Sequence, residues 1–76
     1  MEKMMRHEIE AAAREILEYL ESYGDTPVLL MKDHLGKPEL YYYMGLGDLI
    51  LQHRVSIQEC QGAMWAIRSG TSVKAA

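Results

Sequence analysis

The sequence predicts a small α+β domain in which an N-terminal helix, a three-stranded antiparallel sheet and a C-terminal helix follow one another. Three observations lead to this prediction. Apolar residues recur every three or four positions up to Tyr23, which is typical of a helix. A turn signal precedes three consecutive tyrosines at 41–43, and a helix-start pattern begins at Ser56. Residues 1–70 are expected to form one domain and residues 71–76 a flexible tail.

The segment that ends near Tyr23 is expected to be an amphipathic helix. Gly24 is suited to end it, because glycine adopts positive φ without strain. Most acidic residues of this chain, whose net charge is −3, precede residue 26, so an acidic stripe should face away from the core. This stripe is either a solvated surface or a partner-binding face with Glu10, Glu18 and Glu21 as its candidate residues. The apolar positions at helical spacing are Met5, Ile9, Ala12, Ala13, Ile16, Leu20 and Tyr23.

The segment from Thr26 to Met44 allows two interpretations. In the favoured one, residues 28–32 and 39–44 are two strands joined by a turn at 33–36, and Pro38 lies on an edge. The tyrosine triplet supports it, since aromatic side chains fit a pleated, half-buried surface. In the other, Thr26 and Pro27 begin a helix and Gly36 ends it.

Residues 49–55 alternate in a way that suits a third strand, although a short helix over 48–53 fits nearly as well. Ser56 and Glu59 form the pattern of a capping box, which predicts a last helix that runs to about Arg68 and ends at Gly70. An all-α bundle with a helix-turn-helix at 48–68 stays open as the alternative fold.

The sequence carries no motif for catalysis, a cofactor or a metal. There is no nucleophile elbow and no phosphate-binding loop, and the glycines at 45 and 47 predict a bend. His7, His34 and His53 are too widely spaced to form a zinc-ligand pair. Cys60 is expected to act as a small hydrophobic residue on the last helix. We therefore expect a protein that is not an enzyme and that needs no cofactor.

The composition is typical of a protein of the reducing cytoplasm. The single cysteine cannot form an internal disulfide, and no apolar run is long enough to cross a membrane. The start of the chain lacks the apolar core of a signal peptide. A cytoplasmic protein without membrane contact is the expectation.

The favoured function is binding to a protein partner. On a strand, Tyr41 and Tyr43 would point away from the helices together with Arg54, while Leu40, Tyr42 and Met44 would point inward. Tyrosine and arginine are common at protein interfaces, and an acidic helix complements a basic, nucleic-acid-handling protein. Phage- and plasmid-borne inhibitors, such as anti-CRISPR proteins, are similar in size and charge. A small regulatory or inhibitory protein is therefore expected.

Two other functions remain open. A nucleic-acid-binding transcriptional regulator would use Lys32, Lys37, Arg54 and Arg68 for phosphate contacts. An assembly subunit would form a homodimer through its exposed apolar face.

Overall fold

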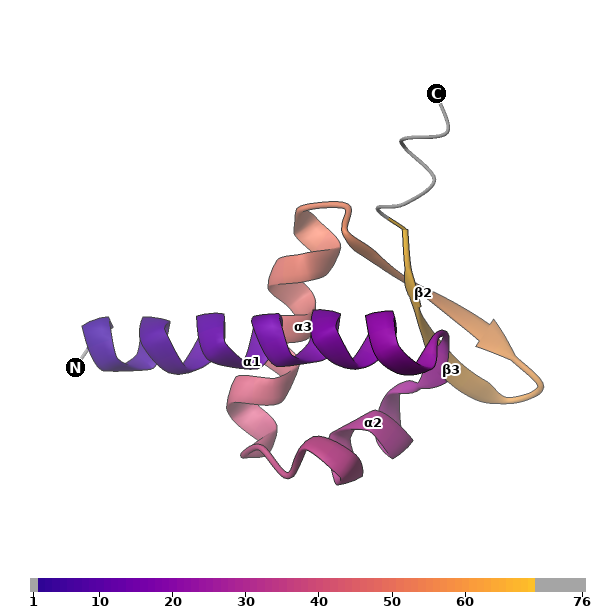
Figure 1. The fold of residues 1–76 in the computed structure, drawn as a ribbon, viewed down its shortest axis with the longest axis horizontal. Helices are drawn as coiled ribbons and strands as arrows, with labels where there is room; N and C mark the ends of the chain where they lie inside the picture. The colour runs from indigo at the N-terminus through magenta and orange to yellow at the C-terminus, as the bar shows by residue number, and fades with distance from the viewer. Residues whose placement is uncertain (1, 70–76) are drawn as a thin grey trace.

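The computed structural model describes residues 2–69, which form three helices and one three-stranded antiparallel sheet of strand order β1-β3-β2 (Figure 1). The α+β class is thus confirmed, while the order of the elements only partly matches the predicted one. The predicted tail at 71–76 lies outside the described residues. In chain order the elements are α1 (Glu2–Tyr23), β1 (Thr26–Pro27), α2 (Val28–Leu35), α3 (Glu39–Leu51), β2 (Val55–Cys60) and β3 (Ala63–Arg68).

The first helix is confirmed, including its end. Ala12, Ile16 and Leu20 are buried along one face of α1. Gly24 has a φ of 83°, and its N–H donates a 2.8 Å hydrogen bond to the carbonyl oxygen of Leu20. The strong helix formers and the regular apolar spacing make this segment helical from local signals alone.

The predicted hairpin over residues 28–44 is wrong; its first part is helical, as the other interpretation had it, but the helix begins at Val28, and Thr26–Pro27 form β1. Helix α2 follows Pro27 directly and ends at Gly36, whose φ is 64° and whose N–H donates to the carbonyl of Lys32. Pro38 precedes the first turn of α3 instead of lying on a sheet edge. A proline fits there because the first amides of a helix have no intrahelical acceptor.

The predicted third strand over residues 49–55 is also wrong. Helix α3, which includes the tyrosine triplet, continues to Leu51, and β2 begins only at Val55. Gly45 and Gly47, where a bend was expected, both lie within this helix. Gly45 is buried against α1, and a Cβ there would lie 2.9 Å from the backbone nitrogen of Ala13. The close crossing of α1 and α3 therefore depends on a residue without a side chain.

The predicted C-terminal helix is a β-hairpin, so a helix-turn-helix at 48–68 is wrong as well. Strands β2 and β3 pair over their whole length, with Val55 opposite Arg68 and Cys60 opposite Ala63. Gln61 and Gly62 join them with φ values of 52° and 83°, as in a two-residue type I′ turn. Ser56 and Glu59 lie within β2 and form no helix cap.

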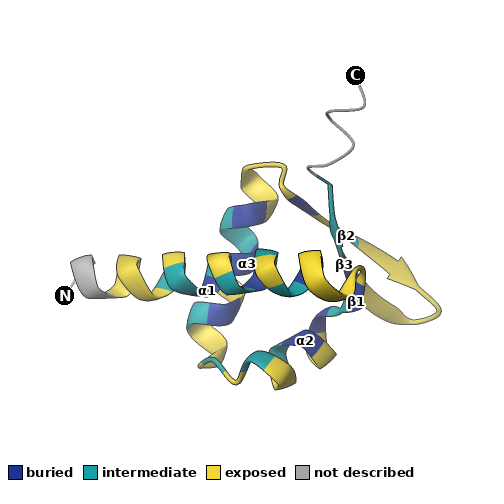
Figure 2. Cartoon of the chain, viewed as in Figure 1, coloured by how far each residue is buried: buried dark blue, intermediate teal, exposed yellow. Residues whose placement is uncertain are grey.

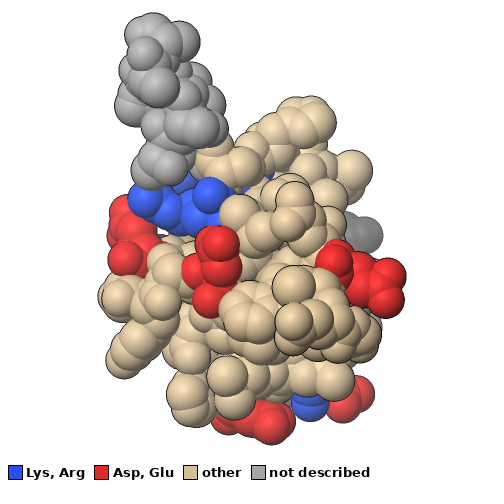
Figure 3. All heavy atoms as spheres, turned by 90° about the vertical axis from the view of Figure 1, so that its right-hand side faces the viewer, with Lys and Arg blue, Asp and Glu red and all other residues tan. Residues whose placement is uncertain are grey.

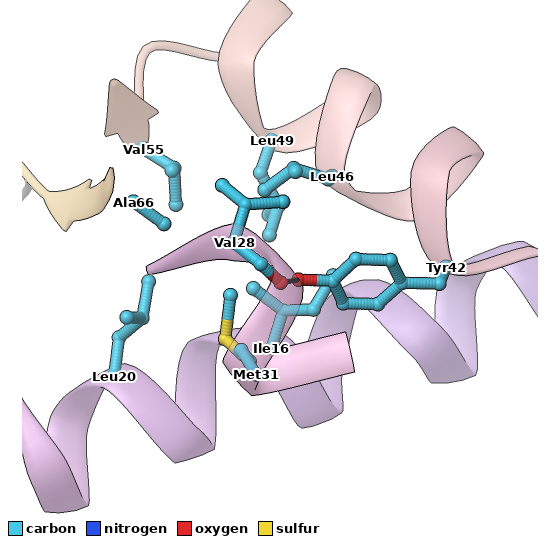
Figure 4. Packing of buried hydrophobic residues seen from close by; sticks show 9 residues of the cluster. All are labelled: Ile16, Leu20, Val28, Met31, Tyr42, Leu46, Leu49, Val55 and Ala66. Carbon is cyan, nitrogen blue, oxygen red and sulfur yellow. Dashed lines mark hydrogen bonds between the residues drawn. The ribbon is translucent and has the colours of Figure 1, made fainter. Parts of the chain in front are cut away.

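The helices and the sheet enclose one hydrophobic core (Figures 2 and 4). The hydroxyl of Tyr42 donates a 2.7 Å hydrogen bond to the carbonyl oxygen of Val28, which satisfies its polar atom inside the core. The core members come from the three helices and from β2 and β3: Ile16, Leu20, Val28, Met31, Tyr42, Leu46, Leu49, Val55 and Ala66.

Candidate protein-binding face

Helices α2 and α3 form a helix-turn-helix at residues 28–51. Three residues that begin with Gly36 connect them, which is the usual length and composition of the turn in this motif. The β2–β3 hairpin follows directly, so the element order is that of a winged helix-turn-helix domain (Figure 1). The helix-turn-helix that the alternative fold placed at 48–68 is wrong, and the motif at 28–51 was not predicted.

Helix α3 is apolar on two opposite sides. One side is buried in the core and includes Tyr42, Leu46 and Leu49. At 100° per residue, the opposite side is an arc of about 120° that carries no charged residue. We call this second side the apolar α3 face, and its members are Leu40, Tyr43, Met44, Gly47, Ile50 and Leu51.

Five of the six members of the apolar α3 face are exposed, and Gly47 is half-buried. The exposed fraction is 56% for Leu40 at one end and 79% for Leu51 at the other. Gly47 lies in the middle of the arc, and nothing lies within 4 Å of a Cβ built on it. The face therefore presents large side chains before and after a central position where a second backbone can approach closely.

The charges on α3 are few and negative. Glu39 at its start and Asp48 near its end are its only charged residues, and it has no lysine or arginine. In DNA-binding helix-turn-helix proteins, residues near the start of the second helix contact base edges. Here that position holds a carboxylate, which repels the nucleic-acid backbone.

Three of the four basic residues expected to contact phosphate pair with acidic side chains of the same chain. The pairs join Lys32 with Glu39 at 3.3 Å, Lys37 with Glu15 at 2.9 Å, and Arg68 with Glu21 at 3.4 Å. Arg54, the fourth, is exposed on the loop that links α3 to β2. The basic residues are thus spread over the molecule, and most of their charge is balanced locally.

The structure separates the tyrosines that were expected to share a sheet face. Tyr43 belongs to the apolar α3 face and is 42% exposed, whereas Tyr41 is half-buried and points about 160° away from it around the helix. The inward direction of Tyr42 is confirmed, but Leu40 and Met44, also expected inward, are exposed. The reason is the helical conformation, in which side chains point around the axis instead of alternating.

The three candidate acids of α1 do not act as one site. Glu10 lines a shallow groove of about 340 Å³ between α1 and α3, and Glu18 is exposed farther along the helix. Glu21 pairs with Arg68 on the hairpin. The groove borders the apolar α3 face through Met44, and its lining comprises Met5, Arg6, Ile9, Glu10, Met44 and Asp48.

The outer face of the sheet carries other residues than the expected Tyr41, Tyr43 and Arg54. Trp65 lies there opposite Gln58 and Pro27, half-buried, on the side away from Ala66. Figure 3 looks onto the right-hand side of Figure 1, where uncharged residues make up most of the surface; a blue patch and a red group lie above and to the left of its middle, and further red atoms lie at its edges. The signal for the apolar α3 face lay in the sequence, because positions 40, 43, 44, 47, 50 and 51 follow helical spacing once the segment is taken as a helix.

Chemistry-bearing side chains are scattered over the described part of the chain. Among residues 2–69, no group of three or more His, Cys, Asp or Glu side chains is placed to hold a metal ion. Nδ1 of His34 shares a 2.6 Å hydrogen bond with the hydroxyl of Tyr19. Cys60 is exposed at the end of β2, so its expected place on the apolar side of a helix is wrong. Within the same residues, no helix has the length and apolar character needed to span a bilayer.

Burial changes the acidity of one phenol in this region. It raises the pKa of Tyr42 well above its usual value, and the neighbouring phenols of Tyr43 and Tyr19 add to the shift. The Tyr42 hydroxyl therefore acts as a neutral hydrogen-bond donor that holds α3 to α2.

No family model, curated protein or solved structure matches this chain.

Proposed function

We propose that this protein is a non-enzymatic regulatory or inhibitory protein that acts by binding another protein chain through the apolar α3 face. The observation that carries the proposal is the second apolar side of α3. A helix that is apolar all round is normally buried on all sides, whereas here one whole side, from Leu40 to Leu51, meets solvent. A contiguous apolar surface of this kind is characteristic of an interaction site.

The composition of the face fits a protein partner. Tyrosine and methionine are enriched at protein interfaces, while charged residues are depleted in their centres. Tyr43 and Met44 lie on the two flanks of the exposed arc, about 100° apart around the helix, and the charged residues of α3, Glu39 and Asp48, lie just outside its edges. An apolar centre with a charged rim is the usual anatomy of such a surface.

The acidic stripe of α1 supports a secondary role. Glu10 and Glu18 add negative charge around the binding face and would speed the approach of a partner with a basic surface. Glu21 contributes less, because Arg68 partly balances its charge. A small phage- or plasmid-type inhibitor of a nucleic-acid-handling protein is the class that this size and charge favour, by analogy with proteins of that kind.

The second candidate function is that of a nucleic-acid-binding regulator, which the helix-turn-helix and the following hairpin favour. Its weakness is electrostatic. Phosphate contacts supply most non-specific affinity for nucleic acid, and α3 has an acidic residue and no basic one near its start.

A titration with nucleic acid separates the two candidates. Mixed single- and double-stranded oligonucleotides are added at low and at moderate salt, and binding is followed by the fluorescence of Trp65 and by mobility shift. We expect no binding at either salt concentration. Binding that falls steeply as salt increases would replace our proposal with the nucleic-acid function.

A photo-crosslinking pair tests the face itself. A photoreactive amino acid at Leu51 reports on the apolar α3 face, and the same amino acid at Tyr23, which is 73% exposed at the end of α1, is the matched control. We expect protein adducts from position 51 and few from position 23. Equal labelling from both positions, or adducts with nucleic acid at position 51, would contradict the proposal.

A further inference from the structure

We propose that the partner of the apolar α3 face is the same face of a second copy of this chain, packed antiparallel about a twofold axis at Gly47. This inference rests on the proposed function, since it takes the apolar α3 face as the binding surface and names a second copy as what covers it. The acidic stripe of α1 then becomes the candidate surface for a partner of basic charge. Twofold dimers are the commonest symmetric assemblies, and they require a surface that complements itself.

The apolar positions are symmetric about Gly47. Met44 and Ile50 lie three residues before and after it, and Tyr43 and Leu51 lie four residues before and after it. In an antiparallel pair centred on Gly47, Met44 of one copy meets Ile50 of the other, and Tyr43 meets Leu51. Every contact in the centre is therefore apolar against apolar, and no charge is buried there.

Gly47 allows the two helices to approach closely. A Cβ at this position would meet nothing within 4 Å inside the monomer, so glycine is not required there by the fold of a single chain. Gly45, two residues earlier, is required because it packs on α1. A glycine in a helix costs stability relative to alanine, and the dimer accounts for it, because a central glycine lets two helix backbones come together.

Charge on one flank favours the antiparallel arrangement. The groove beside Met44 carries both signs, with Arg6 on one hand and Glu10 and Asp48 on the other. A twofold axis through antiparallel helices brings the same flank of both copies to the same side. Arg6 of each copy then approaches the carboxylates of the other, and the opposed helix dipoles add a small favourable term.

The first experiment measures the mass of the protein by sedimentation equilibrium over a micromolar-to-millimolar series. All variants carry Cys60→Ser, which removes the exposed thiol and any disulfide dimer. We expect a reversible dimer. Gly47→Glu places two like charges at the axis and should raise the Kd of the dimer by about a hundredfold. Gly47→Ala adds a methyl group at the axis but no charge, so it should weaken the dimer much less than Gly47→Glu does.

Circular dichroism of each variant shows that it is folded, and both substitutions at position 47 enter open space in the monomer. A protein that stays monomeric throughout the series overturns the dimer. So does a dimer that Gly47→Glu leaves unchanged. If the monomeric protein also binds no oligonucleotide, the proposed protein-binding function stands without the dimer. If it binds oligonucleotide with a steep salt dependence, both proposals fail.

Cysteine crosslinking tests the orientation in the same Cys60→Ser background. Gly47→Cys alone should form an intermolecular disulfide, because position 47 lies on the axis and meets itself. Tyr43→Cys alone and Leu51→Cys alone should crosslink poorly, whereas a mixture of these two variants should crosslink well. In a parallel dimer each position meets itself, so efficient crosslinking of each single variant would overturn the antiparallel arrangement.

Discussion

The hydroxyl of Tyr42 donates a 2.7 Å hydrogen bond to the carbonyl oxygen of Val28, and this contact joins the first turn of α3 to the first residue of α2. Both residues are buried, and Tyr42 is fully so. Among the described residues, no buried side-chain nitrogen or oxygen lacks a hydrogen-bond partner. The geometry of the helix-turn-helix therefore depends on a polar contact inside an otherwise apolar core.

Tyr42→Phe should lower the free energy of unfolding by about 1 kcal/mol, because the ring stays buried while one buried hydrogen bond is lost. In a domain of this size that corresponds to a fall in Tm of about 4–8 °C. Urea and thermal denaturation measure both quantities. Tyr43→Phe is the control, since Tyr43 is 42% exposed and no hydrogen bond holds its hydroxyl in the core. An equal effect of the two substitutions would show that the contact adds no stability.

Alkaline pH should destabilise the protein through the same phenol. Burial raises the pKa of Tyr42 in the folded state above its unfolded value of about 10. Below pH about 10 both states keep the proton, so this group makes stability independent of pH. Above it the unfolded state releases the proton first, and stability falls by up to about 1.4 kcal/mol per pH unit.

The measurement is urea unfolding at several pH values from 8 to above 10, for the wild type and for Tyr42→Phe. The difference between the two proteins isolates the contribution of this phenol, because all other ionisable groups are shared. The difference should shrink as the pH rises through the unfolded pKa. A difference that stays constant through this range would contradict the expected ionisation.

The two glycines of α3 should respond in opposite ways to the same substitution. At Gly45 a Cβ would lie 2.9 Å from the nitrogen of Ala13 and 3.1 Å from the carbonyl oxygen of Ile9, so Gly45→Ala must push α1 and α3 apart. We expect a loss of about 1–3 kcal/mol, as for overpacking elsewhere. Gly47→Ala enters open space and should stabilise the helix by about 0.5–1 kcal/mol.

Thermal denaturation of both variants at a low protein concentration, where the monomer dominates, measures these changes. A stabilised Gly45→Ala variant would show that α1 and α3 cross less closely than described. A destabilised Gly47→Ala variant would place atoms of the monomer against the apolar α3 face.

The first helix was predictable because its signals are local. Its apolar spacing, its helix-forming composition and Gly24 all agree, and each is visible without knowledge of the rest of the chain. Helix α3 was not predictable in this way. Three tyrosines and two glycines favour a strand and a bend by propensity, and only the packing of Gly45 on α1 and of Tyr42 in the core makes the segment helical.

The apolar α3 face was not predicted from the sequence for the same reason. Its members share a side only if residues 39–51 are a helix, and alternation on a strand divides them between two faces. Tyr43 is exposed as expected, but on a helix instead of a strand, and Leu40, which was expected to face the core, is 56% exposed. An error in the periodicity of one segment thus moved the predicted surface from a helix to a sheet.

The β-hairpin was missed because Ser56 and Glu59 form a capping-box pattern, whereas Gln61-Gly62 is not one of the residue pairs that signal a type I′ turn. In the structure both turn residues have positive φ, of 52° and 83°. Glutamine is not a preferred residue in this conformation, whereas asparagine adopts it readily. The hairpin therefore keeps local strain at one residue that a single substitution can relieve.

Gln61→Asn should raise the free energy of unfolding by about 0.5 kcal/mol, since an Asn-Gly pair is favoured in a type I′ turn. Gly62→Ala should lower it by about 1–2 kcal/mol, because its φ of 83° is costly for a residue with a Cβ. Neither side chain would meet the core, as both positions are exposed at the tip of the hairpin. Urea denaturation measures the two changes. A helical segment over 56–68 would reverse the second, because alanine stabilises helices relative to glycine, so the sign of the Gly62→Ala effect distinguishes a hairpin from a helix.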